Sequence, residues 1–275
     1  MRFGRRLARA VSERGPLCVG IDPHPALLDA WGLPADVDGL ERFALSCVDA
    51  LAGEVAVIKP QSAFFEAFGS AGIAVLERTI MDCRDAGALV LLDIKRGDIG
   101  STMAAYAQAY LSDAAPLSVD AVTLSPYLGF GALDPALELA EQTGKGVFVL
   151  ALTSNKEGAS VQRATGGEDA AGRTVAQVIA DEAAARNAGA SPYGDVGLVI
   201  GATVGSTELD LSRLNGPILA PGFGAQGATV NDLRRLFGPG LTGVLPASSR
   251  DILRHGPDPS HLRDALRRVR DSLAA

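Results

Sequence analysis

Short apolar runs alternate with helix-like stretches along the whole chain, and this alternation constrains the fold more than any other feature. The eight apolar runs are residues 17–22, 55–59, 88–95, 121–125, 146–153, 196–203, 217–221 and 241–246. Most are continuously apolar, which is typical of parallel strands buried on both faces. The helix-like stretches between them are residues 39–52, 72–86, 101–113, 131–143, 172–187, 207–214, 230–237 and 260–273. Strands that alternate with helices predict repeated β-α-β units.

Eight such units in 275 residues predict one α/β domain, a (β/α)8 TIM barrel that spans residues 1–275. A doubly wound open sheet is the alternative, but it normally carries a Gly-rich turn after its first strand. Here the first run ends at Asp22 and continues into Pro23-His24-Pro25, which contains no glycine. Residues 2–14 are Arg-rich, as in a transit peptide. We expect them instead to form an amphipathic helix that leads into the first strand.

Composition limits the classes of partner. Aromatic residues make up 5% of the chain, the net charge is −7, and the pI is about 5.0. This argues against nucleic acid as a partner. No apolar run approaches the roughly 18 residues of a membrane span, so we expect no membrane contact. Three widely spaced cysteines, Cys18, Cys47 and Cys83, are expected to be the reduced thiols of a cytoplasmic protein.

Lysine is scarce, and two of the four lysines end apolar runs. Lys59 closes the second run and Lys95 the third; the others are Lys145 and Lys156. A charge at the end of a buried strand is costly unless it is paired. Unlike arginine, lysine can give up a proton when its pKa is shifted. Lys59 and Lys95 are therefore candidates for chemistry, although a strand-end lysine can also simply extend to solvent.

The densest group of charges is the motif D-x-K-x-x-D, formed by Asp93, Lys95 and Asp98. Asp93 and Lys95 are two residues apart on a strand, so they share one face, whereas Ile94 points toward the helices. At the mouth of a barrel they would meet Lys59 from the neighbouring strand. Alternating charges can be buried together where single ones cannot. The alternative is a purely structural ion pair that closes the top of the barrel.

A second group lies after the last two strands. Residues 220–227 are Gly-rich and contain Gln226, and residues 246–250 end in Arg250. The loops after strands 7 and 8 of a barrel commonly bind phosphate through backbone N–H groups and a bidentate arginine. The alternative is an ordinary Gly-rich turn. The long polar segment 154–170 after strand 5 is typical of a lid or binding loop.

Few residues are available to bind a metal. Only one of the three histidines, His24, lies at a strand end, so a multi-histidine metal site is not expected. Asp22, Asp93 and Asp98 carry the right charge for Mg²⁺, but lysines compete for it. We therefore expect no metal and no cofactor.

Together these motifs resemble the orotidine 5′-phosphate decarboxylase family, in particular its longer bacterial branch. Residues 93–99 resemble the family's D-x-K-x-x-D-I, and residues 221–226 resemble its P-G-x-G-x-Q. The resemblance runs from strand 1 to strand 8. It implies a carboxy-lyase that converts orotidine 5′-phosphate to UMP without a cofactor, the last step of de novo pyrimidine synthesis.

The resemblance also implies roles for individual residues. Catalysis would fall to an alternating network of Lys59, Asp93, Lys95 and Asp98. Substrate would be bound by six further residues, Asp22, Ile99, Thr102, Ser154, Gln226 and Arg250.

Within that set, Asp22 and Lys59 would bind the ribose hydroxyls and Ser154 the pyrimidine edge. Gln226 and Arg250 would hold the phosphate, with Arg254 as the alternative arginine. The segment Asp98–Thr102 would enter the active site of a partner subunit, which predicts a homodimer with shared sites.

Three other functions remain open from the residues alone. The first is a Mg²⁺-dependent barrel resembling 3-keto-L-gulonate 6-phosphate decarboxylase, although that family carries an acid where Lys59 stands. The second is an aldolase that forms a Schiff base at Lys95. The third is a non-catalytic barrel that senses phosphate compounds.

Overall fold

Eight parallel strands close into a barrel in the computed structural model, which describes residues 1–167, 170–204, 208–224 and 227–274. The strands are β1 (Cys18–Ile21), β2 (Val57–Pro60), β3 (Leu89–Arg96), β4 (Ala121–Leu124), β5 (Gly146–Leu152), β6 (Val196–Ile200), β7 (Ile218–Pro221) and β8 (Val244–Ser248). Each strand pairs with its sequence neighbour, and β8 returns to β1 through Cys18↔Ala247 and Val19↔Ser248. This closure confirms the TIM barrel and excludes the open sheet.

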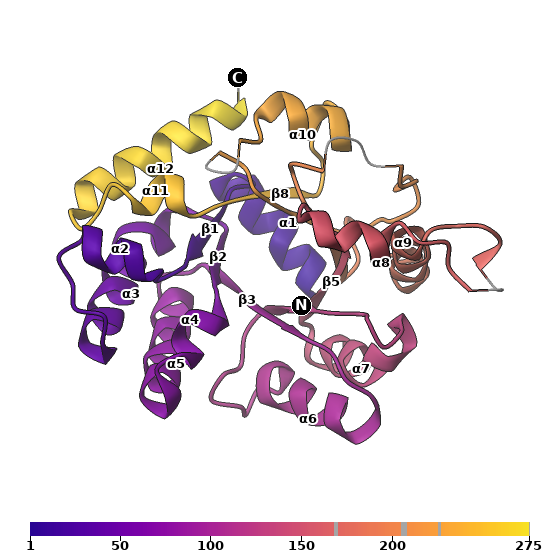
Figure 1. The fold of residues 1–275 in the computed structure, drawn as a ribbon, viewed down its shortest axis with the longest axis horizontal. Helices are drawn as coiled ribbons and strands as arrows, with labels where there is room; N and C mark the ends of the chain where they lie inside the picture. The colour runs from indigo at the N-terminus through magenta and orange to yellow at the C-terminus, as the bar shows by residue number, and fades with distance from the viewer. Residues whose placement is uncertain (168–169, 205–207, 225–226, 275) are drawn as a thin grey trace.

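Helices form a ring around the strands (Figure 1). The longer ones are α1 (Phe3–Arg14), α3 (Val37–Leu51), α5 (Gly69–Asp85), α6 (Gly100–Leu111), α7 (Asp134–Thr143), α9 (Val175–Arg186), α10 (Val230–Phe237) and α12 (Pro259–Ala274). The shorter ones are α2 (Pro25–Ala30), α4 (Ser62–Glu66), α8 (Ala159–Gln162) and α11 (Arg250–Leu253), with 3₁₀ turns η1 (Ala52–Glu54), η2 (Phe130–Leu133) and η3 (Lys156–Gly158). Across the described residues, no helix combines the length and apolar character needed to cross a membrane.

Two sequence predictions of secondary structure were wrong. Residues 208–214, the described part of the expected helix 207–214, contain no helix. The backbone N–H and carbonyl of Asp210 bond instead to the side chain of Gln177 on α9, and Asp210 Oδ1 accepts from Ser212 N–H. Such bonds compete with helical ones. The eighth strand begins at Val244 rather than at residue 241, because positive φ angles at Leu241 (46°) and Gly243 (75°) turn the chain there.

The strands separate two apolar layers. Inside the barrel, side chains such as Val57, Leu91 and Phe148 pack on one another and on α1. The opposite faces of the strands pack against the helices, and Ile94 belongs to this outer layer as predicted. The period-two alternation of a strand therefore decides which residues reach the barrel axis.

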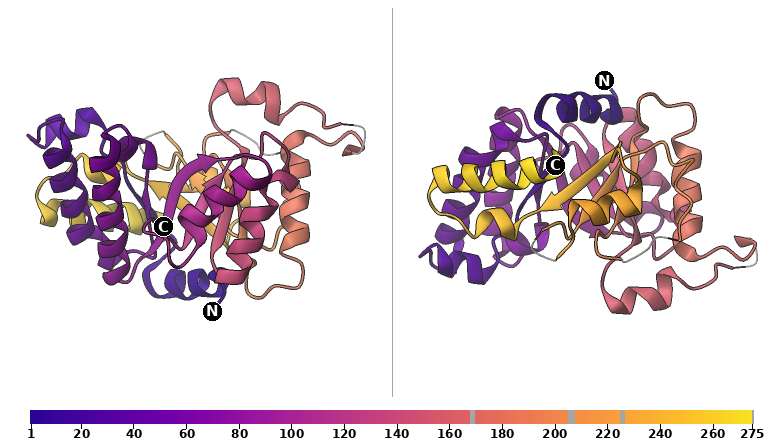
Figure 2. Two further views of the ribbon diagram at one scale, coloured as in Figure 1. Left: turned by 90° about the horizontal axis from the view of Figure 1, so that it is seen from below. Right: turned by 90° about the horizontal axis from the view of Figure 1, so that it is seen from above.

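Helix α1 closes the amino-terminal end of the barrel. Its Phe3 is buried edge-to-face on Phe148, with ring centroids 6.0 Å apart. Arg2 pairs with the buried Asp195 at 2.6 Å, and Arg6 pairs with the buried Asp120. The segment containing α8 projects from the opposite end (Figure 2). The open end of the barrel is thus the one where the strands terminate.

Candidate active site

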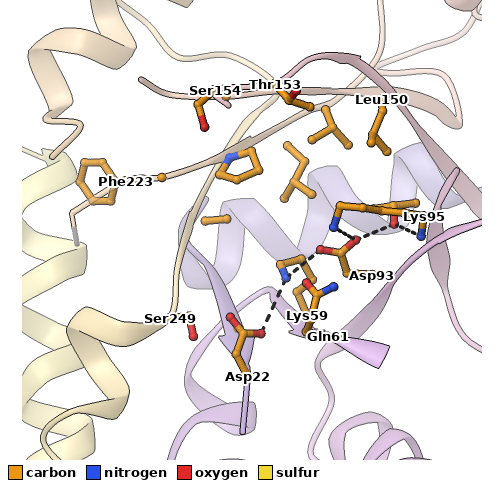
Figure 3. Close-up of a pocket in the computed structure, with 18 of the residues that line it drawn as sticks. Asp22, Lys59, Gln61, Asp93, Lys95, Leu150, Thr153, Ser154, Phe223 and Ser249 are labelled. Carbon is orange, nitrogen blue, oxygen red and sulfur yellow. Dashed lines mark hydrogen bonds and ion pairs between the residues drawn. The ribbon is translucent and has the colours of Figure 1, made fainter. Parts of the chain in front are cut away.

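A cavity of about 470 Å³ occupies the carboxyl-terminal mouth of the barrel (Figure 3). This volume lies in the usual range for small-molecule sites. Its charged and polar lining comes from the ends of many strands, because parallel strands deliver their carboxyl ends to one edge. Of the residues predicted from sequence, the lining includes Asp22, Lys59, Asp93, Lys95, Ser154 and Arg250.

Four of these side chains form a row of alternating charge. Lys59 Nζ lies 3.9 Å from Asp22 Oδ1 and 3.3 Å from Asp93 Oδ2. Lys95 Nζ lies 2.6 Å from Asp93 Oδ1. The row therefore runs from Asp22, the residue after β1, through Lys59 of β2 to Asp93 and Lys95 of β3 (Figure 3). Each inner charge has an opposite charge on both sides, which is how buried ions are tolerated.

The members of the row differ in how far they are buried, and this difference indicates which of them can contact a ligand. The side chains of Lys59 and Asp93 are 8% exposed, whereas that of Lys95 is 45% exposed. Lys59 and Asp93 are thus fixed inside the protein, and the Lys95 ammonium can meet a ligand in the cavity.

The charges keep the buried pair ionised. Burial alone would raise the pKa of Asp93, but Lys59 and Lys95 outweigh it and hold that pKa at about 2. Burial would likewise lower the pKa of Lys59, but Asp22 and Asp93 outweigh it and raise that pKa. At neutral pH the site therefore contains a fixed carboxylate and a fixed ammonium.

The other end of the cavity is lined by the segments after β7 and β8. Gly222, Phe223, Ser249 and Arg250 face it. Gly222 has a φ of 101°, a conformation that favours glycine and lets the backbone lie close to the cavity. Arg254 instead pairs with Asp251 at 3.3 Å. The structure thus brings Arg250 to the cavity, whereas Gln226 lies outside the described residues.

Ser154 sits where β5 leads into the projecting segment. The preceding Thr153 is bound twice by Gln162 of α8: its N–H donates to Gln162 Oε1 at 2.8 Å, and its hydroxyl accepts from Gln162 Nε2 at 2.8 Å. The α8 segment is therefore hydrogen-bonded to Thr153, the residue of the cavity wall that precedes Ser154.

Three predicted residues do not line the cavity of their own chain. Asp98 is partly exposed, and its Oδ1 accepts from the N–H of Ile99 at 2.8 Å. Ile99 is 61% exposed, and Thr102 is also exposed. The fourth member of the charge row within one chain is therefore Asp22 and not Asp98.

Metal-binding side chains are not grouped in the part of the chain that the structure describes: no three His, Cys, Asp or Glu residues there are placed to hold an ion. The carboxylates of Asp22 and Asp93 face the ammonium of Lys59 instead.

Sequence reasoning overlooked three polar residues of the site. Thr123 of β4 donates to Asp93 Oδ1 at 2.7 Å and accepts from the N–H of Lys95 at 3.0 Å. Gln61 and Gln162 also line the cavity. Strand periodicity could have found Thr123, because it lies two residues after the inward-facing Ala121, and Gln61, because it lies two residues after Lys59. The sequence has no comparable signal for Gln162.

Comparisons with known proteins agree on one family. The chain matches the model of the "Orotidine 5'-phosphate decarboxylase / HUMPS family" over residues 15–264. The orotidine 5′-phosphate decarboxylase of Salinispora arenicola is 66% identical over 267 residues, which are 97% of this chain and 95% of the relative.

Solved structures agree with this. A crystal structure of a Streptomyces avermitilis protein assigned as the same enzyme has a TM-score of 0.94 at 56% identity, covering 99% of this chain and 95% of that one. The OMP decarboxylase of Leishmania donovani has a TM-score of 0.74 at 28% identity and covers 100% of both chains. These relatives give no support to the three other functions considered from the sequence. The chain therefore belongs to the orotidine 5′-phosphate decarboxylase / HUMPS family.

Proposed function

We propose that this chain is a carboxy-lyase that removes CO₂ from C6 of orotidine 5′-phosphate to give UMP, a step of pyrimidine synthesis. The observation that carries the proposal is the alternating row of Asp22, Lys59, Asp93 and Lys95 at the mouth of the barrel. The names of the full-length relatives support the same reaction.

Lys95 performs the central chemical step in this proposal. When the bond between C6 and the carboxylate breaks, CO₂ leaves and the electron pair stays on C6. The Lys95 ammonium stabilises that negative charge and then transfers a proton to C6, and solvent restores the proton to the amine. Its partly exposed side chain, held at 2.6 Å from Asp93, suits a proton donor that must be both accessible and oriented.

Asp93 and Lys59 prepare the site for this step. Asp93 stays ionised because its pKa is held at about 2, and it faces the position of the leaving carboxylate. Repulsion between the two carboxylates raises the energy of bound substrate and is relieved as CO₂ departs. Lys59 prevents Asp93 from being a lone buried charge and, with Asp22, binds the ribose hydroxyls.

The remaining contacts bind parts of the substrate that lie away from the reacting carbon C6. Arg250 and the backbone after β7 bind the phosphate together with Gln226, and Ser154 binds the pyrimidine edge. Binding energy from the phosphate, which does not react, can draw the α8 segment over the cavity and exclude water.

The working unit in this proposal is a homodimer in which Asp98, Ile99 and Thr102 reach the partner's cavity. Three large apolar residues near the mouth support it, namely Ile99, Tyr127 and Leu128, which are 61%, 78% and 53% exposed. The loops after β3 and β4 that carry them are in contact, since Ser125 N–H donates to the carbonyl of Arg96 at 2.7 Å. Exposed apolar side chains that gather in this way are typical of an interface.

Mixing two inactive variants tests the shared site. If Lys95 of one chain works with Asp98 of the other, then Lys95→Ala and Asp98→Asn subunits that are unfolded and refolded together should regain activity. Random pairing leaves about a quarter of the sites intact. Failure to regain any activity, with dimers demonstrated by sedimentation, would exclude the shared site.

We also assign the protein to the cytoplasm. Its three cysteines are unpaired and buried, which suits a reducing compartment.

The decisive experiment measures the absorbance change when purified protein meets orotidine 5′-phosphate, with UMP identified by chromatography. We expect turnover by the natural protein. Lys95→Ala should lose at least about 100-fold in kcat, the usual contribution of a proton donor, yet still bind UMP in a calorimetric titration. Absence of turnover by the natural protein would overturn the proposed function, and undiminished turnover by Lys95→Ala would overturn the role of that lysine.

A further inference from the structure

Strand β3 is irregular at the point where it carries the reactive charges. It pairs with β4 at Leu92↔Val122 and next at Arg96↔Leu124. Residues 93–95 of β3 therefore stand against one residue of β4, Thr123. Within this bulge Lys95 has a φ of 47°, in the left-handed region that residues with a side chain rarely adopt. Such a conformation persists only when its surroundings enforce it.

The hydroxyl of Thr123 supplies contacts that enforce it. Oγ1 accepts a hydrogen bond from the Lys95 N–H at 3.0 Å, a donor that the bulge takes out of the regular strand ladder. A hydroxyl has a single proton, and here it is donated to Asp93 Oδ1 at 2.7 Å. Thr123 is 1% exposed, so both bonds lie inside the protein.

These bonds close a ring around the reactive lysine. Asp93 Oδ1, which Thr123 holds, also accepts from Lys95 Nζ at 2.6 Å. The backbone of Lys95 is thus bound to Thr123 directly, and its ammonium is bound to Thr123 through Asp93. Packing alone cannot fix a side chain that is 45% exposed, so the position of this ammonium depends on the carboxylate beside it.

We propose that Thr123 is a positioning residue, which fixes the Asp93 carboxylate and the bulged Lys95 backbone so that the ammonium meets the substrate carbon in the reactive geometry. This inference rests on the proposed function. Its physical basis is that charges accelerate a reaction when they are oriented before the reaction begins. An error of about 1 Å in such a group can cost about 100-fold in rate.

Two substitutions distinguish the effect of the Thr123 hydroxyl on activity from the effect of the shape of its side chain. Thr123→Val keeps the branched shape and removes the hydroxyl, whereas Thr123→Ser keeps the hydroxyl and removes the methyl group. We expect Thr123→Val to lower kcat about 10- to 100-fold while the KM for orotidine 5′-phosphate changes less than about threefold, because the phosphate contacts are untouched. Thr123→Ser should recover most of the lost kcat.

Thr79→Val is the matched control. Thr79 is also fully buried, and its hydroxyl donates at 2.7 Å to the carbonyl of Val75 within α5, outside the cavity lining. We expect this variant to change the urea midpoint of unfolding and to leave kcat per folded molecule unchanged.

Several results would overturn the proposal. One is an unchanged kcat in Thr123→Val. Another is an equal loss in the Val and Ser variants, which would assign the effect to the methyl group. A third is a loss confined to KM or to the fraction of folded protein.

A crystal structure of Thr123→Val gives a readout that needs no activity. We expect Lys95 to leave the left-handed region or its Nζ to move away from Asp93 Oδ1. An unchanged geometry would overturn the positioning role whatever the rates. If the natural protein failed to turn over orotidine 5′-phosphate, the proposed function would fall, whereas this structural comparison would still decide whether Thr123 holds the two charges.

Discussion

Replacing Lys59 with methionine removes a buried cation from between two carboxylates. Its Nζ lies 3.3 Å from Asp93 Oδ2 and 3.9 Å from Asp22 Oδ1, and the side chain is 8% exposed. At an effective dielectric constant of about 20, the shorter pair attracts with about 5 kcal/mol before the cost of burial is subtracted. Removing one partner of a buried pair typically costs about 3–5 kcal/mol. We expect Lys59→Met to lose about this much free energy of unfolding at pH 7.

A double-mutant cycle isolates the pair. With Asp93→Asn in the same chain, the orphaned charge disappears. The double variant should therefore be more stable than the sum of the single effects predicts, by about 2 kcal/mol. Urea unfolding followed by circular dichroism, with the slope of free energy against urea unchanged, measures each variant.

Arg78→Met is the control for a surface pair. Arg78 lies 3.4 Å from Glu41 and is 57% exposed, so its loss should cost less than about 1 kcal/mol. Effects of Lys59→Met and Asp93→Asn that add within about 0.5 kcal/mol would refute the reasoning, because independent residues add in this way.

The pH dependence supplies a second check on the same pair. The pKa of Asp93 lies near 2 in the folded protein against an ordinary value of 3.8, because the two lysines outweigh the effect of burial. A depressed carboxyl pKa stabilises the fold above the ordinary value and loses that stabilisation as the pH falls through the folded value. The contribution of Asp93, about 2 kcal/mol at pH 6, should thus fall by about 1 kcal/mol at pH 3. A contribution that stays constant across this range would show that Asp93 is not held ionised.

Three further outcomes follow from the site. Arg250→Ala should lower kcat/KM about 10- to 100-fold, the value of one charge-assisted hydrogen bond. The guanidinium of Arg254 pairs with Asp251, so Arg254→Ala should leave kcat/KM within about threefold of the natural protein. Equal losses in the two variants would contradict the assignment of Arg250 to phosphate. Gly224→Ala should lower the free energy of unfolding, measured in urea, by at least about 1 kcal/mol, because φ is 77° there and a Cβ would overlap Asp251 Oδ2. Gly240→Ala, where a Cβ has room, should cost under about 0.5 kcal/mol. Full turnover should persist in excess EDTA, because lysine ammonium groups already occupy the carboxylates, and a loss restored by Mg²⁺ would refute this.

The barrel and three members of the charge row, Lys59, Asp93 and Lys95, could be predicted from the sequence because both follow from the pattern of the strands and their ends. Continuous apolar runs indicated strands buried on both faces, and the spacing of Asp93 and Lys95 placed them on one face. The termini of elements were less predictable. Whether residue 241 extends a strand or turns depends on the backbone angles of Leu241 and Gly243, which an apolar sequence does not reveal.

The contacts made by Thr123 and Gln162 could not be predicted, for a shared physical reason. Thr123 is one of many threonines, and its importance arises only from a bulge in the neighbouring strand that brings the Lys95 N–H to it. Gln162 reaches Thr153 from a short helix nine residues further along the chain, a contact that no local spacing encodes. Contacts made by irregular backbone therefore needed the structure.

The closure of the amino-terminal end by α1 has a practical consequence for engineering. Phe3 and the Arg2–Asp195 pair lie at the pole of the cylinder remote from the cavity, which opens where the strands terminate. Heat tolerance could therefore be raised by redesigning that pole, with the catalytic mouth left unaltered. The usual conflict between robustness and turnover is eased here by the distance between the two ends.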